Sequence, residues 1–152
     1  MALEYNLEVE TNLSSTELLK SLSTTSNFVW GQGDRVKFLL GSGLTVTAIQ
    51  QEGWSQSIIE ETFSFKPSVT VLFRIESDSD YYLTRRIMLQ TSIKIMQLFS
   101  GDLVLLYNGE TIVLQRLRNQ LLLNQDFWTW EESDLDQIKL PYELRSLPSP
   151  LL

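Results

Sequence analysis

The chain has 152 residues, a formal net charge of −7, no cysteine and no histidine. This length is typical of one domain, expected over residues 1–152, which buries enough surface to need neither a disulfide nor a metal. The missing histidine and cysteine exclude Ser-His-Asp and Cys-His catalysis, and the negative charge disfavours a nucleic-acid partner. We therefore expect no enzyme activity, no cofactor and no metal site.

The first predicted elements are a strand and a short helix. Residues 3–9 alternate apolar and polar side chains, which is the pattern of a strand with one solvated face. Ser14 and Glu17 have the spacing of a capping box, so a short helix is expected to run to about Ser23.

The next segment predicts a hairpin, a second short helix and another strand. The sequences RVKFLL and LTVTAI, at 35–40 and 44–49, are expected strands joined by a turn at 41–43. A short helix is expected at 54–61. The stretch 68–76 alternates again, so its apolar side chains should face one side of the sheet.

One long helix is expected from about Ser79 to Ser100. Apolar residues recur along it at helical spacing, and Gly101 is placed where a helix C-cap is common. The residues expected to face the core are Ile87, Met88, Ile95 and Phe99.

The remaining strands are expected to form a three-stranded array. The dipeptide Asn108-Gly109 separates two apolar runs and predicts a type I′ hairpin turn. A turn near Asn119 should add a third strand, QLLLN. The proline-containing stretch 140–152 is expected to lie extended on the surface as a C-terminal tail.

These elements predict an α+β fold. Its single antiparallel sheet carries one long helix and one short helix, in the order β-α-β-β-β-α-β-β-β, because strands joined by hairpins must run antiparallel.

Short polar motifs give only weak site signals. The acids Glu76, Asp78 and Asp80 resemble a cation site but suit the first turn of a helix better. The pair Glu60-Glu61 is expected on a solvated helix face, and the GxG at 31–33 is expected to be a turn. The arginines at 85, 86, 116 and 118 are expected to balance nearby acids.

The segment FWTWEESDLD, at 127–136, combines three aromatic residues with four carboxylates. It can be read as the end of the core followed by a solvated helix start, or as a contact surface for a basic partner. In the second reading, Phe127 enters the core and a tryptophan anchors the partner. The predicted partner-binding residues are Trp128, Trp130, Glu131, Glu132, Asp134 and Asp136.

Five blocks of the sequence resemble the SitI3-like family, a bacterial family named for immunity proteins that protect against a swarming-inhibition toxin. The blocks occur in family order; Ser64 departs from the pattern, where a glycine is expected. They are MALEYNLEV, FSFKPSVTVLFR (63–74), GDLVLLYNGE (101–110), LLLN (121–124) and LPYELRSLP (140–148).

The resemblance implies an interaction protein that binds and neutralises a cognate toxin, expected to be a basic protein. The opposing hypothesis is a small ligand-binding module or a hydrolase with a carboxylate-lined pocket. The acidic start of the chain lacks the features of a signal peptide, and no apolar run is long enough for a membrane span. A cytoplasmic protein without membrane contact is therefore expected.

Overall fold

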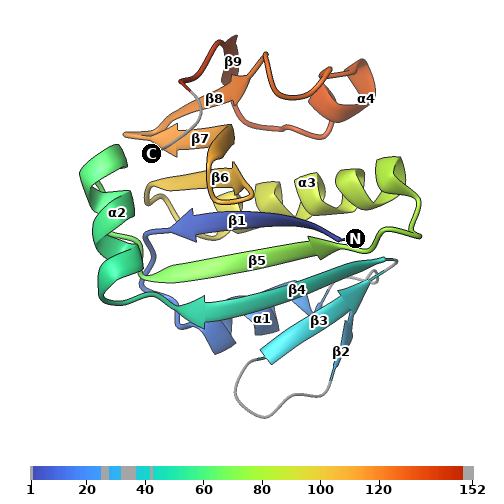
Figure 1. Ribbon diagram of the computed structural model, residues 1–152, viewed down its shortest axis with the longest axis horizontal. Helices are drawn as coiled ribbons and strands as arrows, with labels where there is room; N and C mark the ends of the chain where they lie inside the picture. Colours follow the sequence, from blue (N-terminus) through green and yellow to red (C-terminus); the bar gives the residue numbers. More distant parts are fainter. Residues whose placement is uncertain (1, 25–27, 32–36, 42, 149–152) are drawn as a thin grey trace.

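A computed structural model describes residues 2–24, 28–31, 37–41 and 43–148. It has the predicted α+β fold, with one mostly antiparallel sheet and helices against it (Figure 1). The strands are β1 (Leu3–Val9), β2 (Val29–Trp30), β3 (Lys37–Gly41), β4 (Leu44–Gln50), β5 (Val69–Ile75), β6 (Leu103–Tyr107), β7 (Thr111–Leu117), β8 (Gln120–Asn124) and β9 (Tyr142–Arg145). The helices are α1 (Ser15–Leu22), α2 (Trp54–Phe63), α3 (Tyr81–Leu98) and α4 (Glu132–Leu135).

The sheet has the order β2-β3-β4-β5-β1-β6-β7-β8-β9, so β1 lies near its middle. Every neighbouring pair is antiparallel except β8 and β9, which are parallel. The predicted order omits strand β2, helix α2, helix α4 and strand β9, although a short helix was expected at 54–61. Strand β2 and helix α4 are very short, and β9 lies in the segment that was expected to be a tail.

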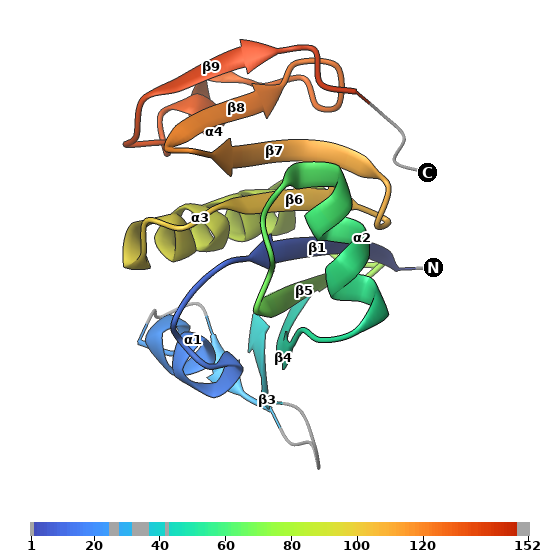
Figure 2. The same cartoon turned by 90° about the vertical axis from the view of Figure 1, so that its left-hand side faces the viewer.

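Helices cover both faces of the sheet. Helices α1 and α3 lie on one face and α2 lies on the other (Figure 2). The larger core lies under α1 and α3 and includes Tyr5, Leu7 and Phe73. A smaller core lies under α2 and contains Ile59, Phe63, Phe65, Val104, Leu106 and Ile112.

Helix α3 packs on the sheet as predicted. Ile87, Met88 and Ile95 are buried, and Phe99 is half-buried against the same core. Leu83 shares their spacing but lies on the outside, where it is 43% exposed. The first turn of α3 is itself covered, because Thr84 is fully buried, so Leu83 lies on the outer side of that turn.

The ends of the helices show how local signals succeed and fail. The capping box is confirmed: Ser14 Oγ accepts from the N–H of Glu17 at 3.1 Å, and the Glu17 carboxylate accepts from the N–H of Ser14 at 3.0 Å. The predicted C-cap role of Gly101 is wrong, because α3 ends at Leu98 and its C-cap is Phe99, in extended backbone. A Cβ at Gly101 would lie 2.0 Å from the carbonyl oxygen of Glu10, so this glycine permits a close approach of two backbones.

The carbonyl groups at the end of α3 are bound by Arg116 instead. Its guanidinium donates to the carbonyl oxygens of Met96 at 2.6 Å, Phe99 at 2.8 Å and Gly101 at 2.8 Å. Burial lowers the pKa of Arg116 from its ordinary value. This arginine therefore satisfies carbonyl groups left open by the helix, and does not serve mainly to balance acids.

Two hairpin turns use residues in the left-handed region. Asn108 and Gly109 have φ of 54° and 73°, which confirms the predicted type I′ turn. Arg118 and Asn119 have φ of 51° and 65° and join β7 to β8 in the same manner. The expected turns at 31–33 and 41–43 include positions outside the described residues.

The stretch 140–148 forms more than a surface tail. Strand β9 pairs in parallel with β8, from Leu121 with Tyr142 to Asn124 with Arg145. Pro141 and Pro148 lie just outside the strand, so neither removes a hydrogen bond from the pairing.

The position that departs from the family pattern also carries backbone strain. Ser64 ends α2 with φ of 64° and ψ of 30°, in the left-handed region that favours glycine. We expect Ser64→Gly to raise the free energy of unfolding by about 1 kcal/mol, because the native conformation then carries no Cβ penalty. Chemical denaturation measures the change. Ser133→Gly, at an exposed position within α4, should instead lower stability, and equal effects at both positions would contradict the explanation.

Candidate functional site

The acidic aromatic segment forms a strap across the edge of the larger core. We define the strap as residues 125–140, which run from the end of β8 through α4 to the start of β9. It lies on the face of the sheet that carries α3. The backbone turns after Asn124 and no strand continues into the strap, so its neighbouring side chains do not follow the two-face alternation of a strand.

The strap is held by a cluster of aromatic rings. Phe127 packs 5.4 Å from the ring of Tyr107, and Trp128 packs 6.2 Å from the ring of Tyr5. Trp128 and Trp130 are 5.0 Å apart between ring centroids. Phe127 therefore packs against the core as predicted, and both tryptophans are part of the same cluster.

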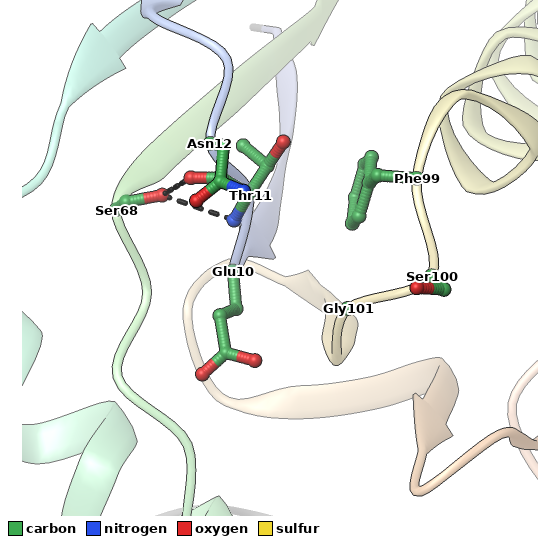
Figure 3. Close-up of a pocket in the computed structure, with 7 residues that line it drawn as sticks. All are labelled: Glu10, Thr11, Asn12, Ser68, Phe99, Ser100 and Gly101. Atoms are coloured by element: carbon green, nitrogen blue, oxygen red, sulfur yellow. Dashed lines mark hydrogen bonds between the residues drawn. The ribbon is translucent and has the colours of Figure 1, made fainter.

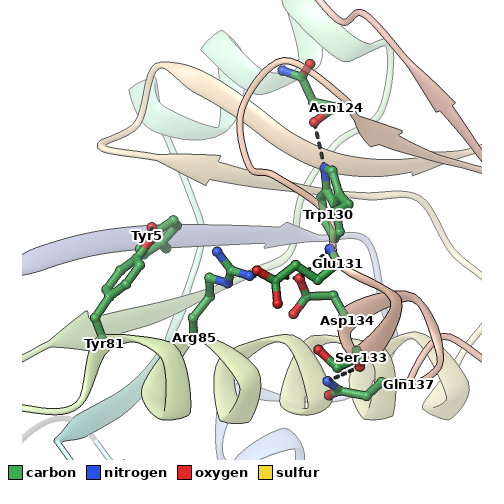
Figure 4. A network of polar contacts seen from close by, with 9 residues as sticks. All are labelled: Tyr5, Tyr81, Arg85, Asn124, Trp130, Glu131, Ser133, Asp134 and Gln137. Carbon is green, nitrogen blue, oxygen red and sulfur yellow. Dashed lines mark hydrogen bonds and ion pairs between the residues drawn. The ribbon is translucent and has the colours of Figure 1, made fainter.

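A buried ion pair joins the strap to α3. Arg85 Nη2 donates to Asp134 Oδ2 at 2.7 Å, and both side chains are under one tenth exposed (Figure 4). The same carboxylate oxygen accepts from the N–H of Glu131 at 3.0 Å. The guanidinium of Arg85 also lies 4.9 Å from the ring of Trp128. These contacts fix the position of α4 relative to α3.

The predicted partner-binding residues divide into two groups. Trp128 and Asp134 are 6% and 4% exposed and are held within the chain, so neither offers a free surface in this structure. Glu131, Glu132 and Asp136 are exposed. Trp130 is half-buried, and its indole N–H donates to the carbonyl oxygen of Asn124 at 2.8 Å. One edge of its ring system is therefore already engaged.

An open hollow of about 380 Å³ lies beside the strap, with Asp126, Phe127, Trp130 and Leu144 among its lining residues. The aromatic and aliphatic side chains give it apolar walls. The Asp126 carboxylate supplies negative charge and accepts a hydrogen bond from the hydroxyl of Ser146. This combination suits the stem and charged end of a lysine or arginine side chain.

The hollow between the end of β1 and the end of α3 does not have the carboxylate pair that a hydrolase of the predicted kind needs. The hollow in Figure 3 has a volume of about 330 Å³ and contains one carboxylate, Glu10. The hydroxyl of Ser68 in that hollow donates to the carbonyl oxygen of Thr11 at 2.8 Å. Its hydrogen bonding is therefore directed at the backbone and not at the hollow.

The acids before α3 act on the helix end. Asp80 is the N-cap of α3, and its side chain accepts from the N–H of Leu83 at 3.2 Å. Glu76, Asp78 and Asp80 together line a separate open hollow of about 420 Å³. Within the described part of the chain, no group of three acidic, histidine or cysteine side chains is placed to hold a metal ion.

Glu8 and Tyr5 are buried titratable side chains whose pKa values are raised. Glu8 lies beneath α2, where its carboxylate accepts hydrogen bonds from Thr70 Oγ1 at 2.7 Å and from Gln51 Nε2 at 3.2 Å. Burial raises the pKa of Glu8. Burial, with a smaller contribution from the Tyr81 hydroxyl, also raises the pKa of Tyr5 above its usual range. Neither residue lines any of the hollows described above.

Sequence reasoning did not identify Trp54, the first residue of α2. Its side chain is 81% exposed, and Ile58 on the next turn is 45% exposed. The spacing i and i+4 puts both on one helix face, while Ile59 and Phe63 are buried on the other. Two separate apolar stripes on one short helix were the signal in the sequence that could have identified this surface.

Comparisons with known proteins give one match. Residues 3–134 match the family model described as SitI3-like, which leaves the block at 140–148 beyond the matched residues. No curated protein and no solved structure matches the chain. In the described residues, no helix is long and apolar enough to cross a membrane.

Proposed function

The chain belongs to the SitI3-like family, and on this premise we propose that it is an immunity-type protein that binds and blocks a cognate bacterial toxin. It acts by occupying a surface of the toxin and performs no chemistry of its own. The family name supports the immunity role. The lack of histidine and cysteine supports action by binding. The carboxylates that share one hollow, Glu76, Asp78 and Asp80, lie at the start of α3, where Asp80 caps the helix.

We propose the strap as the toxin-binding surface because most of its charged side chains are exposed. Glu131, Glu132 and Asp136 are exposed and follow Trp130 in the chain, while the buried cation Arg85 is paired with Asp134. The strap contains one lysine, Lys139, against five acids, so its surface presents net negative charge next to aromatic rings. A basic toxin would be attracted by this charge, and a lysine or arginine of the toxin would enter the hollow.

Co-expression tests the immunity role. Cells that produce the toxin candidate encoded beside this chain's gene should stop growing, and growth should return when this chain is produced in the same cells. The purified pair should form a stable complex. Continued growth arrest in the presence of folded, soluble protein would overturn the proposal for that toxin, and toxin inactivation by amounts far below one copy per toxin would indicate catalysis.

The strap surface predicts a separation of binding from folding. Trp130→Ala should weaken toxin binding by about 2 kcal/mol, because it removes a ring that lines the hollow beside the strap. The Glu131→Lys/Glu132→Lys double variant should slow association about tenfold at low salt, with a smaller loss at high salt. Binding kinetics at two salt concentrations measure both effects, and a thermal melt of each variant reports its folding.

A matched control has the same net charge at a distant position. Glu110→Lys/Asp78→Lys changes two exposed acids outside the strap and should leave the association rate close to that of the unmodified chain. If this control slows association as much as the strap variant, only net charge matters. The proposed strap surface would then be wrong.

A further inference from the structure

Helix α2 has a face that the fold does not use. Ile59 and Phe63 bury its inner face against the sheet and are each 7% exposed. On the opposite face, Trp54 is 81% exposed and Ile58 is 45% exposed. Figure 2 shows α2 standing on the outer side of the sheet, away from α1 and α3. Trp54 therefore contributes little burial to the fold, and Ile58 leaves nearly half of its side chain in solvent.

The attachment of α2 does not depend on Trp54. Besides Ile59 and Phe63, the helix is held by Gln56, whose Nε2 donates to the carbonyl oxygen of Pro67 at 2.7 Å. A tryptophan stabilises a fold by burying its large apolar side chain, and the side chain of Trp54 remains mostly in water. Its exposure therefore favours a role in contact with another molecule over a role in folding.

The surroundings of the apolar pair are acidic and accessible. Glu61 follows Ile58 on the same face, and Glu52 and Glu60 are exposed nearby along the chain. Helix α2 contains no lysine or arginine, and the first cation after it is Lys66. The flanking helix positions carry only small hydroxyl side chains, Ser55, Ser57 and Thr62, which do not cover the pair.

The negative charge around α2 favours a basic protein segment over a second copy of the chain as the bound partner. A second copy of the chain would bring the same carboxylates face to face, between molecules that each carry a net charge of −7. Opposed like charges disfavour such a contact, whereas a basic segment gains from both the apolar pair and the acidic rim.

We propose that the outward face of α2, formed by Trp54, Ile58 and Glu61 with Glu52 and Glu60 at its rim, docks a basic protein segment. An apolar side chain of that segment packs on Trp54 and Ile58, and flanking lysine or arginine side chains meet the carboxylates. The proposal rests on the proposed function only in taking the toxin as the natural source of this segment. It places a contact surface on the sheet face opposite the strap.

A peptide titration tests the surface without the toxin. The probe is a short amphipathic peptide made of leucine and lysine, added to the full ¹⁵N-labelled chain, and the indole N–H signals of the four tryptophans are followed by NMR. The Trp54 signal should show the largest change. A peptide with glutamate in place of lysine should leave the Trp54 signal unchanged.

Variants separate specific docking from general charge attraction. Trp54→Ser/Ile58→Ser should weaken peptide binding at least about tenfold, as expected for removal of a central anchor. The matched control Leu40→Ser/Leu98→Ser removes two exposed apolar side chains elsewhere, of 38% and 39% exposure, and should bind as the unmodified chain does. Glu61→Lys should weaken binding more at low salt than at high salt.

Several outcomes would overturn the proposal. An unchanged Trp54 signal, with the peptide bound at the strap or not bound at all, is one such outcome. An equal loss of affinity in both double variants is another. A change of the Trp54 signal with protein concentration alone, together with a dimer in sedimentation, would assign the face to a second copy. Failure of toxin protection by the unmodified chain, with peptide docking at α2 intact, would defeat only the immunity role.

Discussion

Arg85→Ala is expected to lower the free energy of unfolding by about 3–5 kcal/mol, because it leaves the carboxylate of Asp134 buried without its cation. The Arg85 and Asp134 side chains are 9% and 5% exposed, and their charged atoms are 2.7 Å apart. Water therefore cannot readily replace the lost partner. Arg85→Ala also removes the cation from the ring of Trp128.

Chemical denaturation at neutral pH measures this loss, and the neighbouring residue offers the control. Arg86 is exposed on the same turn of α3, so Arg86→Ala should change stability by no more than about 0.5 kcal/mol. The double variant Arg85→Met/Asp134→Leu should be more stable than Arg85→Ala, since it buries no unpaired charge. Equal stability of the Arg85→Ala and Arg86→Ala proteins would show that the pair does not hold the strap.

Trp128→Ala should lower the free energy of unfolding by a similar amount, about 3–5 kcal/mol. Its ring is 6% exposed and contacts Tyr5, Phe127 and Trp130, so removing it opens a cavity that several rings line. The strap should loosen with it, because Arg85 loses the ring on which its guanidinium rests.

Trp54→Ala is the matched control for this substitution. It removes the same side chain from a position that is 81% exposed, and its effect on stability should stay within about 0.5 kcal/mol. Thermal and chemical unfolding of both variants give the comparison. A large loss from Trp54→Ala, or a small loss from Trp128→Ala, would contradict the assignment of the first to a contact face and the second to the core.

Signals that act over a few residues predicted most of the fold. Ser14 with Glu17 and Asn108 with Gly109 each determine a local backbone geometry, and the structure has both. The alternation in residues 69–75 likewise predicts which side chains of β5 enter the core. Chemistry confined to one turn or one strand can be read without knowing what lies across the molecule.

The features that sequence reasoning missed depend on partners far along the chain. The pairing of Arg85 with Asp134 joins α3 to α4, and no spacing rule connects these residues. Strand β9 exists because β8 offers it an edge, although its own sequence lies between prolines. The burial of Trp128 could not be predicted without its contact to Tyr5, which lies at the other end of the chain. The candidate contact surfaces therefore become visible only when the fold is complete.

The central position of β1 has a consequence for the order of folding. Strand β1 precedes every other described strand, yet Leu3 pairs with Ile75 of β5 and Tyr5 pairs with Tyr107 of β6. During synthesis β1 must wait, unpaired, until both neighbours have left the ribosome. Contacts between such distant residues slow folding, because a long loop must close before they form. Both contact faces should therefore mature late and nearly together, after most of the chain has been made.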